Sequence, residues 1–335
     1  MNNSHPAKCR IADASDPDTV GEAARIIQKG GLVAFPTETV YGLGADAENA
    51  DAVARIFEAK RRPRIDPLIV HVPDMNTARR YGIFPDEALP LMERFWPGPL
   101  TLVADKTPLV PSIVTAGLST VAIRVPAHPS ALALIRASGC AIAAPSANPF
   151  GYVSPTEAGH VAEQLGSAVD LILDGGPSTV GVESTILSFE TSGPVILRTG
   201  GIPVEELQSF LGGVSVKIGS TSRPSVPGQL KRHYSTRTPL EIKDISDNDT
   251  DARRMGKPGE KLGLLTLSLM EDASRYAAVE ILSSSGDLRE AAARLYRALR
   301  RLDALSLDRI IARPFPENGF GMAIMERLRR CAAAL

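Results

Sequence analysis

Four cations fall within five residues at the start of the stretch KRRPRIDPLIVHV. They are Lys60, Arg61, Arg62 and Arg64, and they stand just before an apolar run at Leu68–Val72. A charge run of this kind is most often a solvated surface. Two prolines stiffen this one, however, and a rigid cationic loop suits a polyphosphate ligand. Charge alone leaves both interpretations open.

Other polar side chains lie inside or directly after apolar runs. Arg124 lies within VAIRVP, where a buried charge needs either an internal carboxylate or a bound anion as its partner. Arg198 ends the run in ILRTGG, and His71 lies in a run where spacing alone fits both a core residue and a ligand contact. Small polar residues follow two further runs, in AAPSANPFGYVSPT (143–156) and DGGPSTVGVESTIL (174–187). Loops of this composition resemble ligand-binding loops.

The stretch FPTETVYGLGADA, residues 35–47, combines two threonines, a glutamate and two glycines after an apolar run. Its segment from Gly42 to Ala47 matches the dinucleotide fingerprint GxGxxA. The nearest suitably spaced acid, Asp66, precedes the next strand, which is the wrong end for binding a ribose. We therefore expect the glycines to let the backbone turn tightly or pass close to a neighbour.

Alternating strands and helices must position these residues, and this alternation predicts an α/β fold. The predicted strands are 32–35, 68–72, 100–103, 121–125, 141–144, 171–173, 184–187 and 195–197. The predicted helices are 17–28, 50–60, 86–94, 130–137, 156–165 and 204–211. Pairs of consecutive strands near 100–125 and 184–197 favour a mixed sheet. Because ligands of such sheets bind beyond the strand ends, we expect the polar residues to meet around an anion such as a nucleotide.

The chain is predicted to have two domains and a connecting segment. Residues 1–218 form the larger domain, 219–240 form a linker rich in Ser, Thr, Pro and Gly, and 241–335 form a smaller α/β domain. In the smaller domain the runs LGLLTL, AAVEIL and RIIARP indicate strands, and residues 287–301 and 321–333 indicate helices.

Composition excludes several classes of protein. The net charge is −1, which argues against a nucleic-acid surface as the main feature. The three cysteines are far apart, the histidines lack metal-ligand spacing, and P-loop and GxSxG motifs are absent. No secretory signal or apolar run of about 18 residues occurs, so we expect a soluble, cytoplasmic protein without membrane contact.

Seven motifs in order resemble the YrdC/Sua5 family of L-threonylcarbamoyladenylate synthases, over about residues 17 to 212. They are PTETVYGLGADA, KRRPRIDPLIVHV, FWPGPLTLV, VAIRVPAHP, AAPSANPFGYVSPT, VGVESTIL and ILRTGGI. The linker PGQLKRHYSTRTPL and the remaining chain resemble the longer Sua5 form. Thr236 departs from the family pattern, which often has proline there, and this leaves the path of the linker open.

The resemblance implies a twisted mixed sheet with a concave basic cavity, and a smaller Rossmann-like C-terminal domain. It implies synthesis of threonylcarbamoyl-AMP and pyrophosphate from L-threonine, bicarbonate and ATP, with Mg²⁺ accompanying ATP. The product would feed the N6-threonylcarbamoyl modification of adenosine in tRNA (t6A37) through a downstream tRNA threonylcarbamoyl-transferase complex. The chain itself would meet tRNA only indirectly.

The resemblance also implies roles for individual residues. Phosphoryl charge would be stabilised by the catalytic residues Lys60, Arg62 and Arg198. Threonine would contact Thr37, His71, Arg124, Ala144 and Ser184. ATP would contact Lys60, Arg62, Arg64, Thr120, Ser146, Ser154, Arg198 and Tyr234. Since Lys231, Arg232, His233 and Tyr234 stand together, we expect the linker to be a mobile lid that closes over ATP through Tyr234.

Two other classes of function stay open at this point. The fold has been linked to double-stranded RNA binding, so the chain could be an RNA-binding module, although its net charge opposes this. A nucleotide-sensing regulator would bind ATP without turnover. Pyrophosphate release that requires threonine, bicarbonate and ATP together separates these alternatives.

Overall fold

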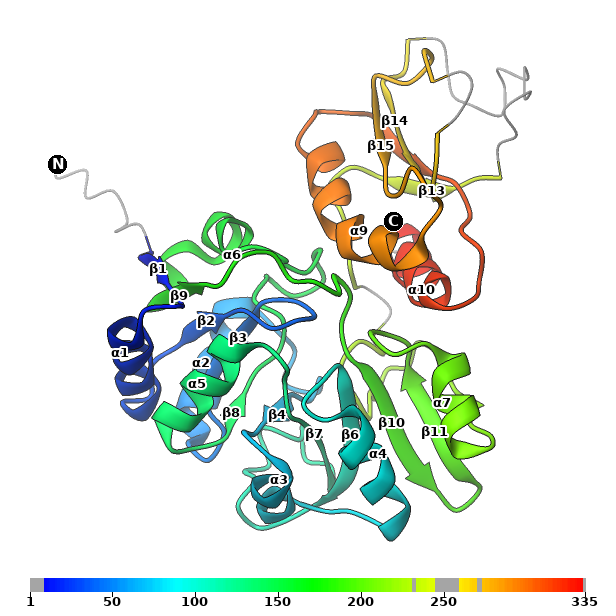
Figure 1. Cartoon of the computed structure of the whole chain (residues 1–335). Helices are drawn as coiled ribbons and strands as arrows, with labels where there is room; N and C mark the ends of the chain where they lie inside the picture. Colours follow the sequence, from blue (N-terminus) through cyan, green and yellow to red (C-terminus); the bar gives the residue numbers. More distant parts are fainter. Residues whose placement is uncertain (1–8, 231–232, 245–258, 270–272, 334–335) are drawn as a thin grey trace, which may run out of the picture.

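The computed structural model describes residues 9–230, 233–244, 259–269 and 273–333, and its first unit is a large mixed sheet flanked by helices (Figure 1). Its strands are β1 (Ile11–Asp13), β2 (Val33–Phe35), β3 (Gly42–Asp46), β4 (Ile69–His71), β5 (Gly82–Ile83), β6 (Leu100–Lys106), β7 (Thr120–Arg124), β8 (Ile142–Ala143), β9 (Leu171–Asp174), β10 (Thr185–Glu190), β11 (Gly193–Arg198) and β12 (Ser215–Val216). Its helices are α1 (Pro17–Gln28), α2 (Ala50–Lys60), α3 (Met75–Tyr81), α4 (Leu89–Phe95), α5 (Pro129–Ser138), α6 (Ala158–Leu165) and α7 (Val204–Leu211), with short 3₁₀ turns at Asp86–Ala88 and Gly166–Ala168.

The sheet has the order β1-β9-β2-β3-β8-β4-β7-β6-β10-β11-β12, and β5 pairs with β6 outside this path. Parallel pairs such as β4 with β7 alternate with antiparallel pairs such as β6 with β7. The predicted mixed α/β sheet is therefore confirmed. The predicted helix over 86–94 is divided, because a 3₁₀ turn precedes α4, and the sequence reading missed α3.

Helix α2 illustrates how local sequence directs the cationic loop. The Asn49 side chain caps its start by accepting hydrogen bonds from the N–H groups of Asp51 and Ala52, each at 3.1 Å. Arg61 ends it in the left-handed conformation with φ of 52°. The chain reverses there, so Lys60 and Arg62 are buried while Arg61 and Arg64 are exposed.

The segment Gly42–Asp46, expected to turn tightly or approach a neighbour, is strand β3, antiparallel to β2 and β8. The expectation of a tight turn is wrong here, whereas the close approach is present. A Cβ atom on Gly44 would lie 2.8 Å from Phe35 Cε1 and 2.7 Å from Ile142 Cγ2. Because the glycines belong to a strand and not to a strand-to-helix loop, the dinucleotide match has no structural counterpart.

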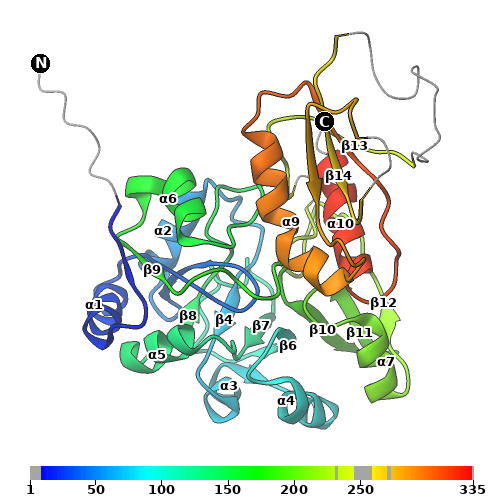
Figure 2. The ribbon, with the colours of Figure 1, turned by 45° about the horizontal axis from the view of Figure 1, so that its top comes forward.

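The second unit is a small parallel sheet covered by two helices. Its elements are β13 (Leu240–Ile242), β14 (Leu262–Thr266), β15 (Ala278–Ile281), α9 (Leu288–Asp303), β16 (Arg309–Ala312) and α10 (Phe320–Ala332). The strand order is β13-β16-β14-β15, and every pair is parallel. Figures 1 and 2 show α9 and α10 between this sheet and the first unit.

The two units share a hydrophobic core. Val40, Val153 and Val182 of the first unit cluster with Leu295 and Leu299 of α9. The segment between β12 and β13 also packs against the first sheet, since Val226 is buried with residues of β4, β6, β7, β10 and β11. No helix within the described residues is both long and apolar enough to span a bilayer.

Candidate active site

A small pocket of about 50 Å³ lies where several strands of the large sheet end, and two residues of the linker are among those that line it. His71 ends β4, Arg124 ends β7, Ser184 precedes β10 and Arg198 ends β11, so separate strands bring these side chains together. The lining residues are Thr37, Thr39, Val40, Gly42, Arg62, Ile69, His71, Arg124, Ala144, Pro145, Ser146, Glu183, Ser184, Arg198, Pro227 and His233. All five threonine contacts implied by the family resemblance are among them.

Arg124 has an internal partner in this structure. Its Nη2 atom lies 2.7 Å from Glu38 Oε1, and its Nε donates to the Gly98 carbonyl at 3.2 Å. Nη1 donates to Thr39 Oγ1 at 2.9 Å. The buried guanidinium is thus neutralised by a carboxylate from the PTET motif, which the sequence reading left open as one of two kinds of partner.

The two threonines of the same motif form a directed chain of hydrogen bonds. Thr37 Oγ1 donates to the Val40 carbonyl at 2.6 Å, and it lies 2.9 Å from Thr39 Oγ1. Because the Thr37 proton is directed to that carbonyl, Thr39 donates to Thr37 and accepts from Arg124. The motif therefore holds Arg124 through Glu38 and Thr39 together, and the Thr37 hydroxyl shapes the turn.

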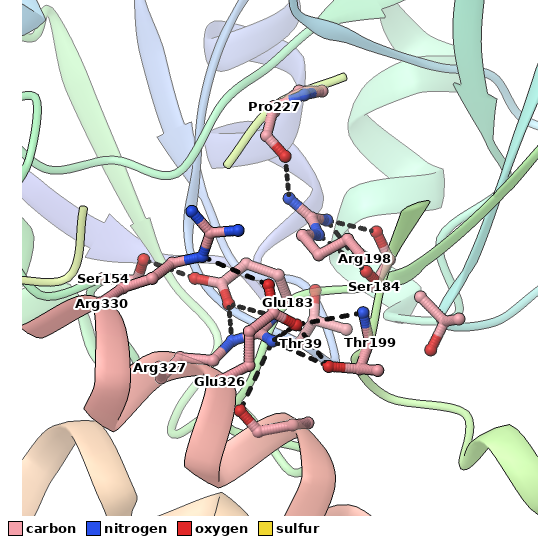
Figure 3. Close-up of polar contacts among 12 residues, drawn as sticks. Thr39, Ser154, Glu183, Ser184, Arg198, Thr199, Pro227, Glu326, Arg327 and Arg330 are labelled. Atoms are coloured by element: carbon pink, nitrogen blue, oxygen red, sulfur yellow. Dashed lines mark hydrogen bonds and ion pairs between the residues drawn. The ribbon is translucent and has the colours of Figure 1, made fainter. Parts of the chain in front are cut away.

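Arg198 links the pocket wall to the linker (Figure 3). Nε and Nη2 donate to the Ser184 carbonyl at 3.1 and 2.9 Å, and Nη2 also lies 3.0 Å from Ser184 Oγ. Nη1 donates to the Pro227 carbonyl at 3.3 Å. Ser184 Oγ is further fixed at 2.7 Å from Thr101 Oγ1. Burial lowers the pKa of Arg198, and the neighbouring carboxylate Glu183 opposes that effect.

Lys60 and Arg62 are buried, so the interpretation of the charge run as a solvated surface does not hold for these two residues. Lys60 Nζ donates to the carbonyls of Ser146 and Asn148, so it fixes the loop after β8. Burial, followed by the charge of Arg62, lowers the pKa of Lys60 well below its usual value. Arg62 pairs with buried Asp66 at 2.9 Å and lines the pocket. Arg62 thus lines the pocket, whereas Lys60 does not.

His71 is a neutral base inside the pocket. Burial lowers its pKa to about 3, with a further contribution from the charge of Arg124. Its Nδ1 atom is buried and has no hydrogen-bond partner within the described part of the chain. This ring nitrogen is therefore available to a ligand that can donate a hydrogen bond.

Five predicted ATP contacts lie outside the pocket lining, namely Lys60, Ser154, Arg64, Thr120 and Tyr234. Arg64 is exposed on the loop surface. Thr120, at the first position of β7, lines a separate open hollow of about 580 Å³ together with Asp105 and Ser188. Tyr234 is buried and stacked on Tyr296 of α9, with ring centroids 5.9 Å apart.

The linker residues that reach the pocket differ from the predicted contact, Tyr234. Pro227 and His233 line the pocket, whereas Lys231 and Arg232 lie outside the described residues. Burial lowers the pKa of His233 well below its usual value, so its ring is neutral.

Glu183 is the main pocket residue that the sequence reading missed. It accepts a hydrogen bond from Ser154 Oγ at 2.6 Å, which accounts for the buried position of that predicted ATP contact. An acid inside the otherwise small and apolar motif VGVESTIL was the available signal. Its other partners belong to the C-terminal unit and become visible only in the tertiary structure (Figure 3).

The described residues do not form a metal-binding site of their own. No group of three or more His, Cys, Asp or Glu side chains with metal-binding geometry occurs among the residues described. The carboxylates nearest the pocket, Glu38, Asp66 and Glu183, are each paired with an arginine. A hard cation such as Mg²⁺ fits this site as part of a phosphate-bearing ligand, since Mg²⁺ is commonly held by substrate phosphates and water.

The fold and the pocket together define an α/β protein with a small, arginine-lined pocket between its large sheet and its linker. A family model described as "Telomere recombination" (Sua5/YciO/YrdC) matches residues 25–200. A second, described as "Threonylcarbamoyl-AMP synthase, C-terminal domain", matches residues 202–333. The second match begins inside the region that we assign to the larger domain.

Relatives and solved structures agree with these matches. The threonylcarbamoyl-AMP synthase of Bacillus subtilis (strain 168) is 46% identical over 95% of this chain and 94% of its own length. That of Pyrococcus abyssi is 41% identical over 92% and 93%. The crystal structure of P. abyssi Sua5 complexed with L-threonine matches with a TM-score of 0.87 and 40% identity, over 95% of each chain. The chain belongs to the Sua5/YrdC family of threonylcarbamoyl-AMP synthases.

Proposed function

We propose that this chain makes threonylcarbamoyl-AMP and pyrophosphate from L-threonine, bicarbonate and ATP, as the first step of t6A37 formation in tRNA. The transferase class follows from its family. One structural observation supports threonine and ATP as the substrates. One pocket combines the arginines Arg62, Arg124 and Arg198 with the neutral imidazole of His71.

The chemistry needs positioning more than a covalent nucleophile. The threonine amine adds to the bicarbonate carbon and water leaves, which gives a carbamate. A carbamate oxygen then attacks the α-phosphorus of ATP, and the bond to the β-phosphate oxygen breaks to release pyrophosphate. Charge develops on phosphoryl oxygens during this step, and fixed guanidinium groups stabilise it. Holding the carbamate in line with the phosphorus supplies the rest.

Each pocket residue has a role that its contacts support. Arg124 binds the threonine carboxylate, with the guanidinium plane already oriented by Gly98 and Thr39. His71 accepts a hydrogen bond from the threonine amine or hydroxyl through Nδ1. Arg62 and Arg198 bind the phosphates. Lys60 acts through the loop that it holds, because both of its described hydrogen bonds go to backbone carbonyls.

The linker must withdraw for ATP to enter. The pocket holds about 50 Å³, far below the roughly 300–1,000 Å³ of ordinary ligand pockets. Pro227 and His233 are the covering residues that come from the linker. We infer that these residues move apart on ATP entry and close again around the bound nucleotide.

Mg²⁺ is proposed to enter with ATP as part of the substrate and to neutralise the leaving pyrophosphate. The product passes to a downstream tRNA threonylcarbamoyl-transferase complex, so contact with tRNA is indirect. A cytoplasmic location without membrane contact accords with this role.

Pyrophosphate release tests the proposal directly. We expect release with ATP, threonine and bicarbonate together, and only background release when any one is omitted. ATP binding without threonine-dependent release would instead favour the nucleotide-sensing regulator. Tight binding of double-stranded RNA without turnover would favour the RNA-binding module.

A further inference from the structure

Glu183 connects the substrate pocket to the C-terminal unit (Figure 3). Glu183 is one of the residues that line the pocket, and it is only 6% exposed. Tyr296 of α9 donates its hydroxyl to Oε1 and Oε2 at 3.0 and 2.9 Å. Arg327 of α10 donates Nε and Nη2 to Oε2 at 3.1 and 3.0 Å. Helices from a different domain thus fix a side chain in the pocket wall.

Arg327 is a fully buried arginine, with 0% of its side chain exposed. Its guanidinium also lies 3.2 Å from Glu326 Oε2 and 5.3 Å from the ring centre of Tyr234. Burial alone would raise the pKa of Glu183, but Arg327 and then Arg198 hold it down to about 2. Glu183 is therefore a fixed anion at neutral pH, engaged by several donors, and it is unsuited to act as a general base.

Stability alone gives little reason to place such a pair here. A buried ion pair loses its solvation, and apolar residues of similar size often serve folding equally well. This pair stands where it can orient pocket groups. Ser154 is buried behind the pocket lining and donates its only hydroxyl proton to Glu183 at 2.6 Å. Ser184, which follows Glu183 in the chain, accepts a hydrogen bond from Arg198 through its carbonyl.

We propose that Tyr296 and Arg327 of the C-terminal domain are positioning residues for the synthase reaction. They hold the Glu183 carboxylate. Through it they orient the Ser154 hydroxyl and the neighbouring pocket residue Ser184. The C-terminal domain is thereby a working part of the substrate pocket. This inference rests on the proposed function.

Tyr296→Phe is the decisive variant, because it removes one hydroxyl and keeps the ring. Its matched control is Tyr81→Phe, which removes a buried tyrosine hydroxyl that donates to Glu48 in the first domain. Tyr296→Phe should lower kcat/KM for threonine and for ATP about tenfold, because it removes a hydrogen bond to a charged group. The control should stay within about twofold of wild type. Melting temperatures of both variants show whether any loss of activity comes with a loss of stability.

Two further measurements separate positioning from general support of the fold. Glu183→Gln should lower kcat/KM, and adding Tyr296→Phe to it should lower kcat/KM by less than about twofold more, because the two act as one unit. Arg327→Lys should recover part of the activity that Arg327→Met loses. Arg329→Met, on the same helix but paired with Glu317 at the surface, serves as its control.

The outcomes are distinct. If Tyr296→Phe and Glu183→Gln keep wild-type kcat/KM, or if their losses simply multiply, the positioning role is wrong. If wild-type protein releases no pyrophosphate with all three substrates, the proposed function fails instead. Should Arg327→Met not fold, the Tyr296 and Glu183 variants still decide the question.

Discussion

Arg124 Nη2 lies 2.7 Å from Glu38 Oε1, and both side chains are buried beside the pocket. The group proposed to bind the threonine carboxylate is therefore already paired with a carboxylate of the protein. On this proposal threonine would share or displace that partner, so we expect Glu38 to influence the affinity of the site for threonine.

This relationship predicts the behaviour of Glu38→Gln. Removing one member of a buried ion pair costs about 3–5 kcal/mol, so the melting temperature should fall. Threonine should then raise the melting temperature more in the variant than in wild type, since its carboxylate again neutralises Arg124. Thermal melts across a threonine titration measure this. An equal or smaller threonine shift in the variant would show that the carboxylate binds elsewhere.

The inward and outward cations of the loop should behave differently. Arg62→Ala should raise KM for ATP by about 10- to 100-fold, the effect of losing a charge-assisted hydrogen bond, and should lower stability because Asp66 is left unpaired. Arg64→Ala should change KM less, because Arg64 is exposed. Arg61→Ala provides a control for loss of charge alone. Steady-state kinetics would contradict this assignment if Arg64→Ala had the larger effect.

Tyr234 offers a test that separates ligand contact from packing. Truncation to alanine should cost about 3–5 kcal/mol, because the ring is buried against Tyr296. Tyr234→Phe keeps that packing, and the hydroxyl has no partner within the described residues, so stability should hold or rise. Lower synthesis in Tyr234→Phe would then report a bond from the hydroxyl to the nucleotide. Full activity would limit Tyr234 to packing.

Closure of the linker should be visible by hydrogen exchange. Backbone amides in 225–230 and 233–238 should exchange more slowly when ATP and threonine are both present, because Pro227 and His233 close over the ligands. Threonine alone provides the control for occupancy without nucleotide. Unchanged protection in these segments with both ligands would mean that the linker is a passive connection.

Stability should depend on the protonation of His71. Its pKa is about 3 in the folded chain and about 6.5 when exposed, so the unfolded chain binds the proton first as pH falls. The free energy of unfolding should therefore fall below about pH 6.5, by up to about 1.4 kcal/mol per pH unit from this group. His71→Gln should make the slope between about pH 6 and pH 4.5 shallower. Denaturant titrations that give parallel slopes for both proteins would contradict this.

The sequence was sufficient for the elements and for much of the pocket. Helices α1, α2 and α7 begin and end where the sequence predicts them, because α1 and α2 carry side-chain caps at Asp16 and Asn49 and the apolar spacing is regular. The family resemblance implied five threonine contacts, and all of them line the pocket: Thr37, His71, Arg124, Ala144 and Ser184.

Only the tertiary structure decided which charges are used internally. Three sets of buried contacts appear only in the folded chain. Glu38 pairs with Arg124, Asp66 pairs with Arg62, and Glu183 is held by Tyr296 and Arg327. The first and the last of these sets join residues more than eighty positions apart. Sequence spacing predicts the faces of an element, but a buried charge takes its partner from whichever element packs against it. For that reason the C-terminal domain, an appended unit in the sequence, supplies the partners of Glu183 in the pocket wall.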